Sequence, residues 1–448
     1  MALVPLTGRT QTTIAFDPNF RNPYIQNWNA SLQRDLGGGM TFSVRYLGNK
    51  GTDLAHGENE NADNIFENGI LSAFQTTVAG GNAPLFNQIF NGLNLGSGVI
   101  DGVNVTGSAS LRAYATTKAF LASNSPGAFA NWLNTTNSFT NVNGGLLSRA
   151  GLPQNFVVVN PQYGTARLVC SCVNSEYDAL VLQFQKRTSH GWTFQANYTR
   201  SKALGTGADV DGADTNSRDP RNWSLDKQLQ SFNPPGSLKA SGTYELPFGP
   251  GRKFTSSSTV LNKLMEKWQF GAILTLQTGT PMSITATADT SFTSGATANT
   301  ATVLGPPSSN LGSVTRTGNG VVYFPGLTQV KDPSIANLTS LQGLAASSTM
   351  LAVARNGQPI LVNPLPGTLG NLGIDTVFGP GLFDLDVSLL KRITVKEKYL
   401  IEFRVDAIGS TNTPQFANPV TDINSTTFGV ISSATGNRVM VANLRVTF

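Results

Sequence analysis

The sequence has few charged residues for its length. Only 13% of its 448 residues are Asp, Glu, Lys or Arg, which is about half the share usual in soluble globular proteins. Glycine and uncharged polar residues take their place, while the hydrophobic share stays ordinary at 40%. Such a composition is typical of a transmembrane β-barrel or a secreted β protein, because uncharged polar side chains suit a wet lumen and long loops. The net charge of +5 is spread without a basic block, so nucleic acid is not an expected partner.

Long apolar runs are also missing. The longest, Phe156–Val159 and Phe270–Leu276, are far shorter than the roughly 20 residues that a membrane-spanning helix needs. This excludes a helical membrane protein. Residues 1–10 contain no basic segment followed by a sustained apolar stretch, so no signal peptide is expected within the chain. An exported barrel would then be present as a mature form or as a fragment.

The chain has only two cysteines and two histidines, which are Cys170, Cys172, His56 and His190. They cannot build a disulfide framework or an ordinary zinc site. Cα atoms two residues apart on an extended strand lie near the upper limit for a disulfide, so a bond between the cysteines requires a local turn. The sequence leaves open whether the two cysteines form a disulfide or remain free thiols. Neither histidine stands beside an activated-nucleophile motif, and no enzymatic activity is expected.

Alternation of apolar and polar residues with a period of two recurs along the whole chain and predicts β-strands. Trp192–Tyr198 shows it best, with Trp, Phe, Ala and Tyr on one side and Thr, Gln and Asn on the other. Each segment has about 9–11 residues, as a tilted transmembrane strand requires, whereas strands of soluble sandwiches usually have about 5–6. Nine strands are predicted, and their clearly alternating parts lie at residues 27–33, 41–46, 180–184, 192–199, 238–246, 268–276, 383–389, 399–407 and 440–448.

Short and long connections alternate between these strands. The short links pass through Gly37–Gly39, Ser189–Gly191, Pro247–Gly251 and Thr394–Lys398. The long links cover residues 51–175, 202–235, 279–380 and 409–437. Outer-membrane barrels have short periplasmic turns and long extracellular loops, so the C-terminus is predicted to be periplasmic. The first strand would then also run inward, which predicts either a hidden strand or a lost N-terminal part; we favour the loss.

The last predicted strand ends on an aromatic residue. Its outward apolar residues alternate with polar ones and are Met440, Ala442, Leu444, Val446 and Phe448. This pattern resembles the signal read by the outer-membrane assembly machinery. The simpler alternative is an ordinary final strand that ends in Phe.

An acidic cluster in the 202–235 link is the most site-like group in the sequence. Asp209, Asp211 and Asp214 surround Gly212 and could supply hard oxygen ligands to Ca²⁺. The spacing is not that of an EF-hand, because the glycine comes too early and Pro220 takes the place of the bidentate glutamate. A solvated acidic turn is the alternative. No other cofactor is expected.

Charged residues on the polar sides of the predicted strands are expected to face the barrel lumen. These residues are Arg45, Glu402, Arg404, Asp406 and Arg445. Charges in a lumen can hold a plug or tune the field of the pore. The alternative is a ladder of ion pairs that stabilises the wall.

Several short stretches spread over residues 20–448 resemble the C-terminal barrel of TonB-dependent receptor-like proteins, specifically the Oar-like group. They are Asn22–Asn29, Tyr46–Thr52, Tyr177–Leu180, Tyr198–Lys202, Tyr244–Arg252, Gly379–Gly381 and Asn412–Pro419. The resemblance implies a barrel of about 22 strands with an N-terminal plug. It also implies transport energised through a TonB-type protein that touches the plug region. We find no candidate plug or energy-coupling segment in this sequence.

These observations predict an all-β fold, an antiparallel transmembrane β-barrel with long extracellular loops. Residues 1–448 would form the C-terminal portion, with about nine to twelve strands of the larger barrel; plug domain and signal peptide would be absent.

The predicted location is the outer membrane of a Gram-negative-type bacterium. The leading hypothesis is a TonB-dependent receptor-like transporter wall whose loops bind an extracellular solute, and the alternatives are a surface structural or adhesion protein and a small passive porin. Expected partners are outer-membrane lipid, the assembly machinery, the plug domain and TonB-type coupler of the full-length protein, and an unknown solute.

Overall fold

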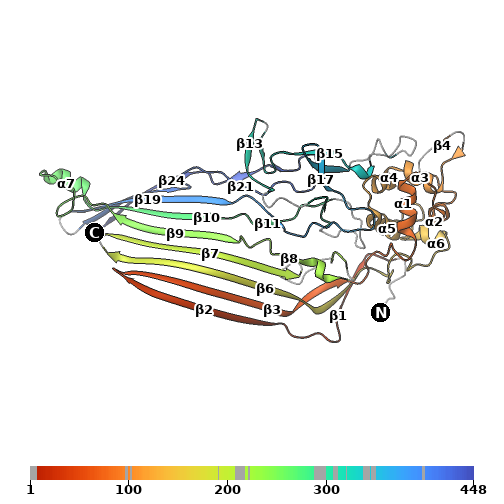
Figure 1. Cartoon of the computed structure of the whole chain (residues 1–448), viewed down its shortest axis with the longest axis horizontal. Helices are drawn as coiled ribbons and strands as arrows, with labels where there is room; N and C mark the ends of the chain where they lie inside the picture. Colours follow the sequence, from red (N-terminus) through yellow and green to blue (C-terminus); the bar gives the residue numbers. More distant parts are fainter. Residues whose placement is uncertain are drawn as a thin grey trace.

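The structure is a computed structural model. It describes residues 8–95, 99–100, 103–189, 191–206, 217–219, 222–286, 299–305, 311–318, 320–335, 344, 350–395 and 399–448. The molecule is elongated, with long strands that run side by side over much of its length and folded loop segments at one end (Figure 1).

One large antiparallel sheet forms the body of the protein. Its nine main strands are β2 (Tyr24–Gly37), β3 (Met40–Asn59), β6 (Tyr163–Ser189), β7 (Trp192–Thr206), β9 (Gly236–Glu245), β10 (Trp268–Gln277), β19 (Leu382–Val395), β20 (Tyr399–Ile408) and β24 (Val439–Thr447). They pair in the order β2-β3-β6-β7-β9-β10-β19-β20-β24. These are the nine strands that the alternation predicts, so the antiparallel β architecture is confirmed. Two short strands, β1 (Gln11–Phe16) and β8 (Lys227–Leu229), pair with β6 and β7.

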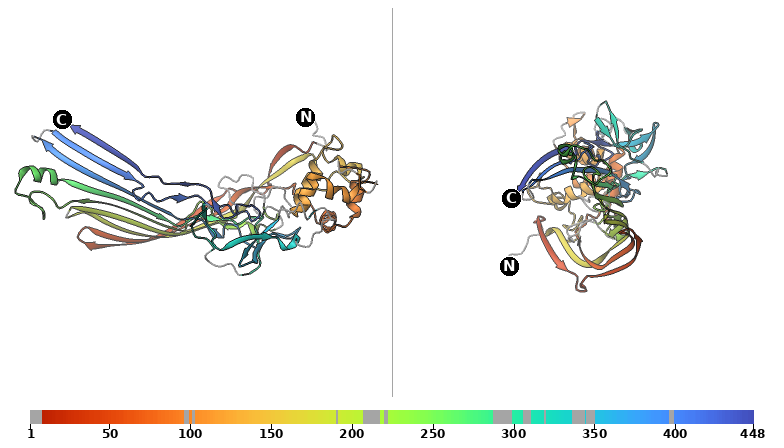
Figure 2. Two further views of the ribbon diagram at one scale, coloured as in Figure 1. Left: turned by 90° about the horizontal axis from the view of Figure 1, so that it is seen from above. Right: turned by 90° about the vertical axis from the view of Figure 1, so that its left-hand side faces the viewer.

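The sheet curves into an open trough (Figure 2). Its two edges are β2 and β24, and every residue of both strands is exposed. Within the described part of the chain the sheet does not close into a barrel. Neighbouring strands alternate in direction, so the first and ninth strands run the same way. Antiparallel closure therefore requires an odd number of further strands between these edges.

One face of the sheet is apolar from β3 to β24. The pairing of β10 with β19 sets Phe270 opposite Leu389, and the pairing of β20 with β24 sets Phe403 opposite Leu444. Directly opposed residues of an antiparallel pair lie on the same face, so the apolar sides of the strands merge into one surface. Leu444 is 67% exposed in the isolated chain. A surface that faces lipid acquires its apolar contacts from the membrane rather than from the protein.

Several strands are longer than the sequence predicts. β6 has 27 residues and β3 has 20, whereas about 9–11 residues suffice to cross the membrane. The additional residues of both strands continue toward the long loops and carry them away from the apolar surface.

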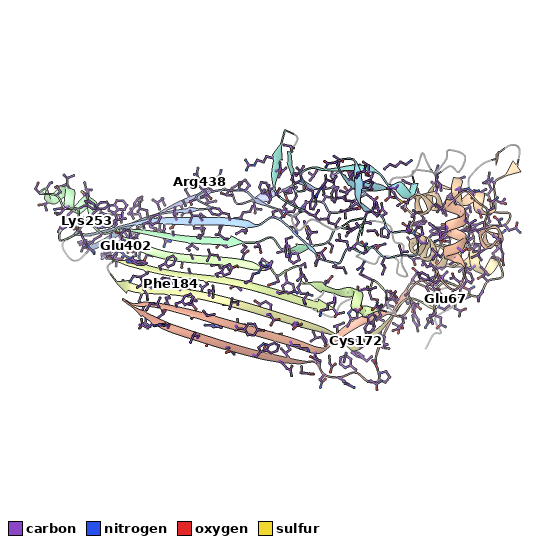
Figure 3. All side chains as sticks on the ribbon, viewed as in Figure 1. Glu67, Cys172, Phe184, Lys253, Glu402 and Arg438 are labelled. Atoms are coloured by element: carbon purple, nitrogen blue, oxygen red, sulfur yellow. A yellow bond between two sulfur atoms is a disulfide. The ribbon has the colours of Figure 1, made fainter. Side chains whose placement is uncertain are left out.

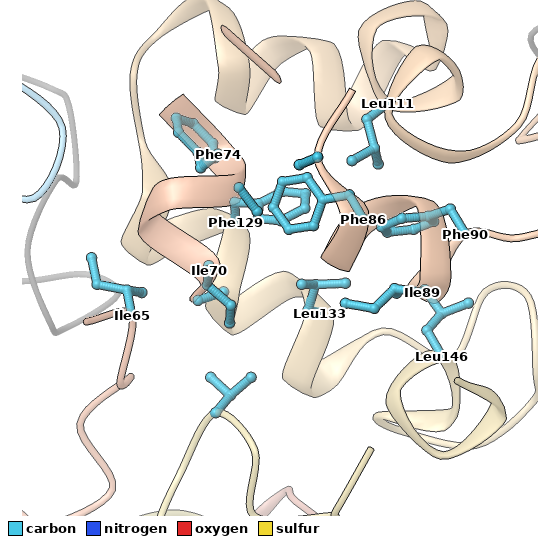
Figure 4. Close-up of a cluster of buried hydrophobic side chains, with 14 of the residues drawn as sticks. Ile65, Ile70, Phe74, Phe86, Ile89, Phe90, Leu111, Phe129, Leu133 and Leu146 are labelled. Atoms are coloured by element: carbon cyan, nitrogen blue, oxygen red, sulfur yellow. The ribbon is translucent and has the colours of Figure 1, made fainter. Parts of the chain in front are cut away.

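The long link between β3 and β6 is not an irregular loop. Residues 60–162, which we call the helical lobe, contain α1 (Ile70–Val78), α2 (Pro84–Ile89), β4 (Val99–Ile100), β5 (Val103–Asn104), α3 (Gly107–Ala113), α4 (Ala115–Ala122), α5 (Pro126–Thr135) and α6 (Gly145–Arg149). Phe74, Phe86, Phe90 and Phe129 are fully buried at its centre (Figure 4). The sequence analysis predicts a long link here but not its internal structure, and the link has a hydrophobic core of its own.

The links 279–380 and 409–437 fold together into a second unit, which we call the β-lobe. Its short elements are β11 (Pro281–Met282), β12 (Thr302–Val303), β13 (Thr315–Thr317), β14 (Gly320–Val322), β15 (Leu327–Lys331), η2 (Pro333–Ile335), β16 (Leu351–Arg355), β17 (Gln358–Val362), β18 (Val377–Phe378), β21 (Gln415–Phe416), β22 (Val430–Ile431) and β23 (Ala434–Thr435). Ile284, Val353 and Ile423 are fully buried in its core. Leu344 packs in the core of the helical lobe instead, so the two lobes are in contact.

The third short link also differs from the prediction. Residues 246–267 are not a tight turn but contain α7 (Thr259–Met265), which begins with the Ser258 hydroxyl accepting a hydrogen bond from Leu261 N. A helix forms there because Ser258 provides an N-cap before residues of good helix propensity. No helix in the described ranges is long and apolar enough to cross a membrane.

We expect Phe129→Ala to unfold the helical lobe without removing the sheet from the membrane. Truncation of a fully buried phenylalanine costs about 3–5 kcal/mol, and Phe129 contacts the rings of Phe74 and Phe86. Limited proteolysis of cells should cleave the variant rapidly within residues 60–162. Val159→Ala is the control, because Val159 is 76% exposed. Equal cleavage rates for the two variants would contradict a core that holds the lobe together.

Candidate functional site

The predicted lumen charges all lie on the polar face of the sheet. The register sets Glu402 opposite Arg445, and Arg404 and Asp406 follow at alternate positions of β20. Continued through the paired strands, the register places Arg45 on this same face, opposite Val181 of β6. Figure 3 shows Glu402 near the end of the sheet that carries the C-terminus.

Two ion pairs occupy this polar face. The Arg392 Nε atom lies 2.8 Å from Glu402 Oε1 across β19 and β20, and Arg404 Nε lies 2.7 Å from Asp406 Oδ1. Both arginine side chains are about half exposed, and exposed ion pairs contribute little to stability, typically about 0–1 kcal/mol. The charges thus remain accessible to water and to anything that fills the trough.

The residues of the predicted assembly signal belong to β24, the strand at one open edge of the sheet, and to the residue after it. Met440, Ala442, Leu444 and Val446 lie on the apolar face, and Phe448 follows the strand with 91% of its surface exposed. They are available for contact with another molecule. Recognition by the assembly machinery stays a prediction.

Cys170 and Cys172 form a disulfide within β6. Their Cα atoms are 5.3 Å apart, which is within the usual disulfide range of about 4.4–6.8 Å. The register of β6 against β3 shifts between Gly51 and Ala55. This β-bulge supplies the local turn that a bond between residues two apart needs. Cys172 is located where the strands leave the sheet for the loops (Figure 3).

A buried polar cluster joins the loops to the extended end of β3. The cluster, which we call the loop clasp, consists of His56, Glu58, Ser217, Arg218 and Asp226. The Ser217 hydroxyl donates to Glu58 Oε1 at 2.7 Å, and His56 Nε2 lies 3.3 Å from Glu58 Oε2. The serine thus bonds to the carboxylate and not to the imidazole, so the cluster lacks the nucleophile–base pair of a hydrolase.

Arg218 extends the loop clasp into the β-lobe. Its backbone N–H donates to both carboxylate oxygens of Asp226, at 3.0 and 3.3 Å. Its guanidinium donates to Thr300 Oγ1 at 3.0 Å and to the Gly370 carbonyl at 2.8 Å. One arginine therefore connects the link between β7 and β9 with two distant points of the long 279–380 link.

Burial controls the ionisation of the clasp. Desolvation raises the pKa of Asp226 to about 6, against the opposing effect of the hydrogen bond and the charge of Arg218. The nearby Glu58 carboxylate raises it further. Burial also lowers the pKa of Arg218. The sequence shows no spacing that brings these residues together, since Glu58 and Ser217 are 159 positions apart.

The predicted calcium ligands Asp209, Asp211 and Asp214 lie outside the described residues, as does His190. Within the described ranges, no group of three or more His, Cys, Asp and Glu side chains could hold a metal ion. Calcium binding at the acidic cluster stays a prediction.

An antiparallel sheet with one continuous apolar face, short connections at one end and long folded connections at the other is the architecture of an outer-membrane β-barrel protein. A family model for the outer membrane beta barrel domain matches residues 2–441. The chain therefore belongs to this family, and its location is the bacterial outer membrane. No curated protein matches the sequence significantly.

Solved structures of outer-membrane transporters are similar at low identity. The FrpB iron transporter from Neisseria meningitidis is 11% identical with a TM-score of 0.32, and the alignment covers 97% of this chain and 32% of that one. The outer membrane transporter YddB from Escherichia coli is 8% identical with a TM-score of 0.37, covering 98% and 34%. FpvA from P. aeruginosa, bound to a pyoverdine, is 9% identical with a TM-score of 0.31, covering 94% and 27%. The chain spans about a third of the length of these proteins.

We expect the loop clasp to weaken as the pH rises from about 4 to about 6. An unfolded aspartate titrates near pH 3.9, whereas folded Asp226 titrates near 6. Because the folded pKa is raised, the stabilisation is fully present below the unfolded pKa and is lost as the pH rises through the folded pKa. Hydrogen exchange at residues 222–229 should be faster at pH 7 than at pH 4 once corrected for the intrinsic rate.

Asp226→Asn should abolish that loss, because Asn keeps an acceptor for Arg218 N without an ionisable proton. The stability of the variant relative to the unmodified protein should therefore increase between pH 4 and pH 7. Glu67→Gln is the matched control, since it removes an exposed carboxylate of the helical lobe. A constant difference between Asp226→Asn and the unmodified protein across this range would argue against the titration of Asp226.

Proposed function

We propose that the chain is the C-terminal wall of a TonB-dependent receptor-like transporter of the Oar-like group. Its folded loops bind a solute outside the cell, and its polar face borders the transport path. The observation that carries the proposal is the combination of a polar face along the sheet, with ion pairs on β19 and β20, and a large structured cap over one end. A barrel that serves only as a membrane anchor needs neither feature.

The loop cap supports solute capture. Three of the long links fold into two lobes with buried cores, and the loop clasp fixes the remaining link to the β-lobe and to the extended end of β3. Rigid positioning of loops lowers the conformational entropy that binding would otherwise cost. The cap therefore supplies a preorganised surface at the extracellular end, where a solute first meets the protein.

The open sheet supports the idea of a larger barrel. Two fully exposed edge strands that run in the same direction leave unpaired backbone groups on both sides, and such groups are not tolerated in lipid. In our proposal an odd number of further strands of the full-length protein closes the barrel, which encloses a plug domain. The charges of β20 and its neighbours then contact that plug, and a TonB-type protein supplies energy through it.

A surface adhesion protein is the second candidate, favoured by the helical lobe. This lobe lies at the far end of the molecule from the C-terminus (Figure 1) and has a core independent of the sheet. A folded module at the tip of long strands is well placed to contact another cell or a matrix. A small passive porin is less well supported, because the described strands do not close a pore.

Thiol labelling should identify the face that borders water. In isolated outer membranes we expect Glu402→Cys to react several-fold faster with a charged maleimide than Phe403→Cys, because the adjacent residues lie on opposite faces of β20. The two native cysteines are disulfide-bonded and give no background. Faster labelling at position 403 would invert the assignment of lumen and lipid faces.

Energy dependence separates the two functions. Cells that express the full-length protein should take up one of a panel of fluorescent siderophore, oligosaccharide and peptide probes, and a protonophore should abolish that uptake while leaving probe binding at the surface intact. Deletion of residues 60–162 should reduce binding. Uptake that persists in the presence of the protonophore would contradict the energised transporter. If the deletion abolishes cell attachment and leaves uptake unchanged, the result supports the adhesion protein.

A further inference from the structure

The apolar face of the sheet has a sharp boundary at the end that carries the loops. On β6 the outward residues Leu180, Leu182 and Phe184 are apolar, Asp178 precedes them, and Lys186 follows them. The eight residue steps from Asp178 to Lys186 span about 27 Å along the strand. A strand tilt of about 40° converts this length to roughly 20 Å of membrane thickness, close to the known apolar band of outer-membrane barrels. Asp178 thus lies at the boundary with the outer leaflet headgroups.

Two cations occupy this outer boundary on the membrane side. Arg200 of β7 is paired with Leu180, and Lys202 is paired with Asp178, so both share the face of the lipid-directed residues. Both side chains are exposed, and neither forms an ion pair within the part of the chain that the structure describes. Asp178 itself accepts a hydrogen bond from the Tyr46 hydroxyl.

The cations at the opposite boundary are arranged differently. Lys186 donates to the Gly38 carbonyl at 2.9 Å and lies 4.7 Å from the centre of the Trp192 ring. Lys391 donates to the Lys263 carbonyl at 2.8 Å and lies 5.6 Å from the Trp268 ring. These lysines are held by the protein, whereas Arg200 and Lys202 extend from the sheet with their donors available.

A cavity of about 390 Å³ adjoins the two free cations. Tyr46, Leu180, Arg200 and Lys202 line it from the sheet, and Gln230 and Asn233 line it from the link that leads to β9. Its wall thus combines apolar residues, including Leu180, Pro281 and Phe378, with cationic and amide groups. Asn233 is held in place by the Ser201 hydroxyl, which donates to Asn233 Oδ1 at 3.1 Å.

We propose that this outer-rim site, formed by Arg200, Lys202, Tyr46 and Asn233, binds the phosphorylated headgroup of a glycolipid in the outer leaflet. Arg200 and Lys202 contact the phosphate, Asn233 contacts the sugar, and Leu180 and Tyr198 on the lower side contact the acyl chains. Guanidinium groups bind phosphate oxygens with two parallel hydrogen bonds, and long cationic side chains at a membrane boundary place their charges at headgroup level.

The charge balance and the position of the site select this ligand. Arg200 and Lys202 carry two positive charges beside the carboxylate of Asp178, and the next pair on the same face, Lys50 and Glu176, adds one charge of each sign. The face therefore keeps a net positive charge at this boundary, which attracts an anion. A headgroup ligand also explains why these cations lie on the lipid side of the sheet rather than on its polar face. A water-soluble anion would reach the charges of the polar face more readily.

The test measures lipid bound to the full chain after extraction from outer membranes in mild detergent. The probe is a diphosphorylated, acylated glucosamine disaccharide, titrated in detergent micelles at low salt and detected by native mass spectrometry. We expect Arg200→Gln/Lys202→Gln to weaken binding about tenfold or more, since the variant loses both charges and the charge-assisted hydrogen bonds to phosphate. The same lipid without phosphates should bind the unmodified protein as weakly as the intact lipid binds this variant.

Two control variants keep the test independent of folding. Lys186→Gln removes a cation from the same face at the opposite boundary and should leave the affinity unchanged. Arg200→Lys/Lys202→Arg exchanges the cations and should keep most of the binding. Equal affinity for the phosphorylated and dephosphorylated lipids, or equal weakening by Lys186→Gln, would overturn the proposal. Inorganic phosphate that displaces the lipid at comparable concentration would also overturn it, because the site would then bind a soluble anion.

Discussion

Backbone pairing along the continuous register from β2 to β24 is the constraint on which the rest of the structure depends. Every strand between the two edges pairs on both sides, which satisfies the N–H and C=O groups that lipid cannot satisfy. The same register decides which side chains face lipid, because a shift of one residue would reverse the two faces. Glu402 and Phe403, adjacent in sequence, therefore meet different surroundings, and the polar face and the apolar face are two results of one pairing pattern.

The long loops depend on the sheet in another way. β3 and β6 extend beyond the length that a membrane needs, so they hold the ends of the helical lobe close together. Inside the lobes, stability comes from ordinary hydrophobic cores of aromatic and aliphatic side chains. Between the loops it comes from buried polar contacts such as those of Arg218 and Glu58. Because unpaired buried polar groups are costly, these contacts make the arrangement of the loops specific.

Much of the sheet could be predicted, because its signal is local. Alternation at Trp192–Tyr198 reports a strand with one lipid face whatever the rest of the chain does. The sequence of the helical lobe also carries a local helical signal. Pro84 and Pro126 occupy first turns of helices, and Ile70, Ala73, Phe74 and Thr77 recur with helical spacing. The loop clasp has no such signal in the sequence, because its members are far apart and each of them alone resembles an ordinary solvent-exposed polar residue.

The sequence by itself determined the nine main strands of the sheet, their antiparallel order and the division of each strand into two faces. These depend on period-two patterning and on connection length, which are readable without tertiary contacts. Only the tertiary structure decided that the loops are folded lobes, that Cys170 and Cys172 bridge a bulge, and that Asp226 and Arg218 are buried together. The physical reason is that burial, register shifts and the distances between loop residues arise from packing of distant segments, which no local pattern records.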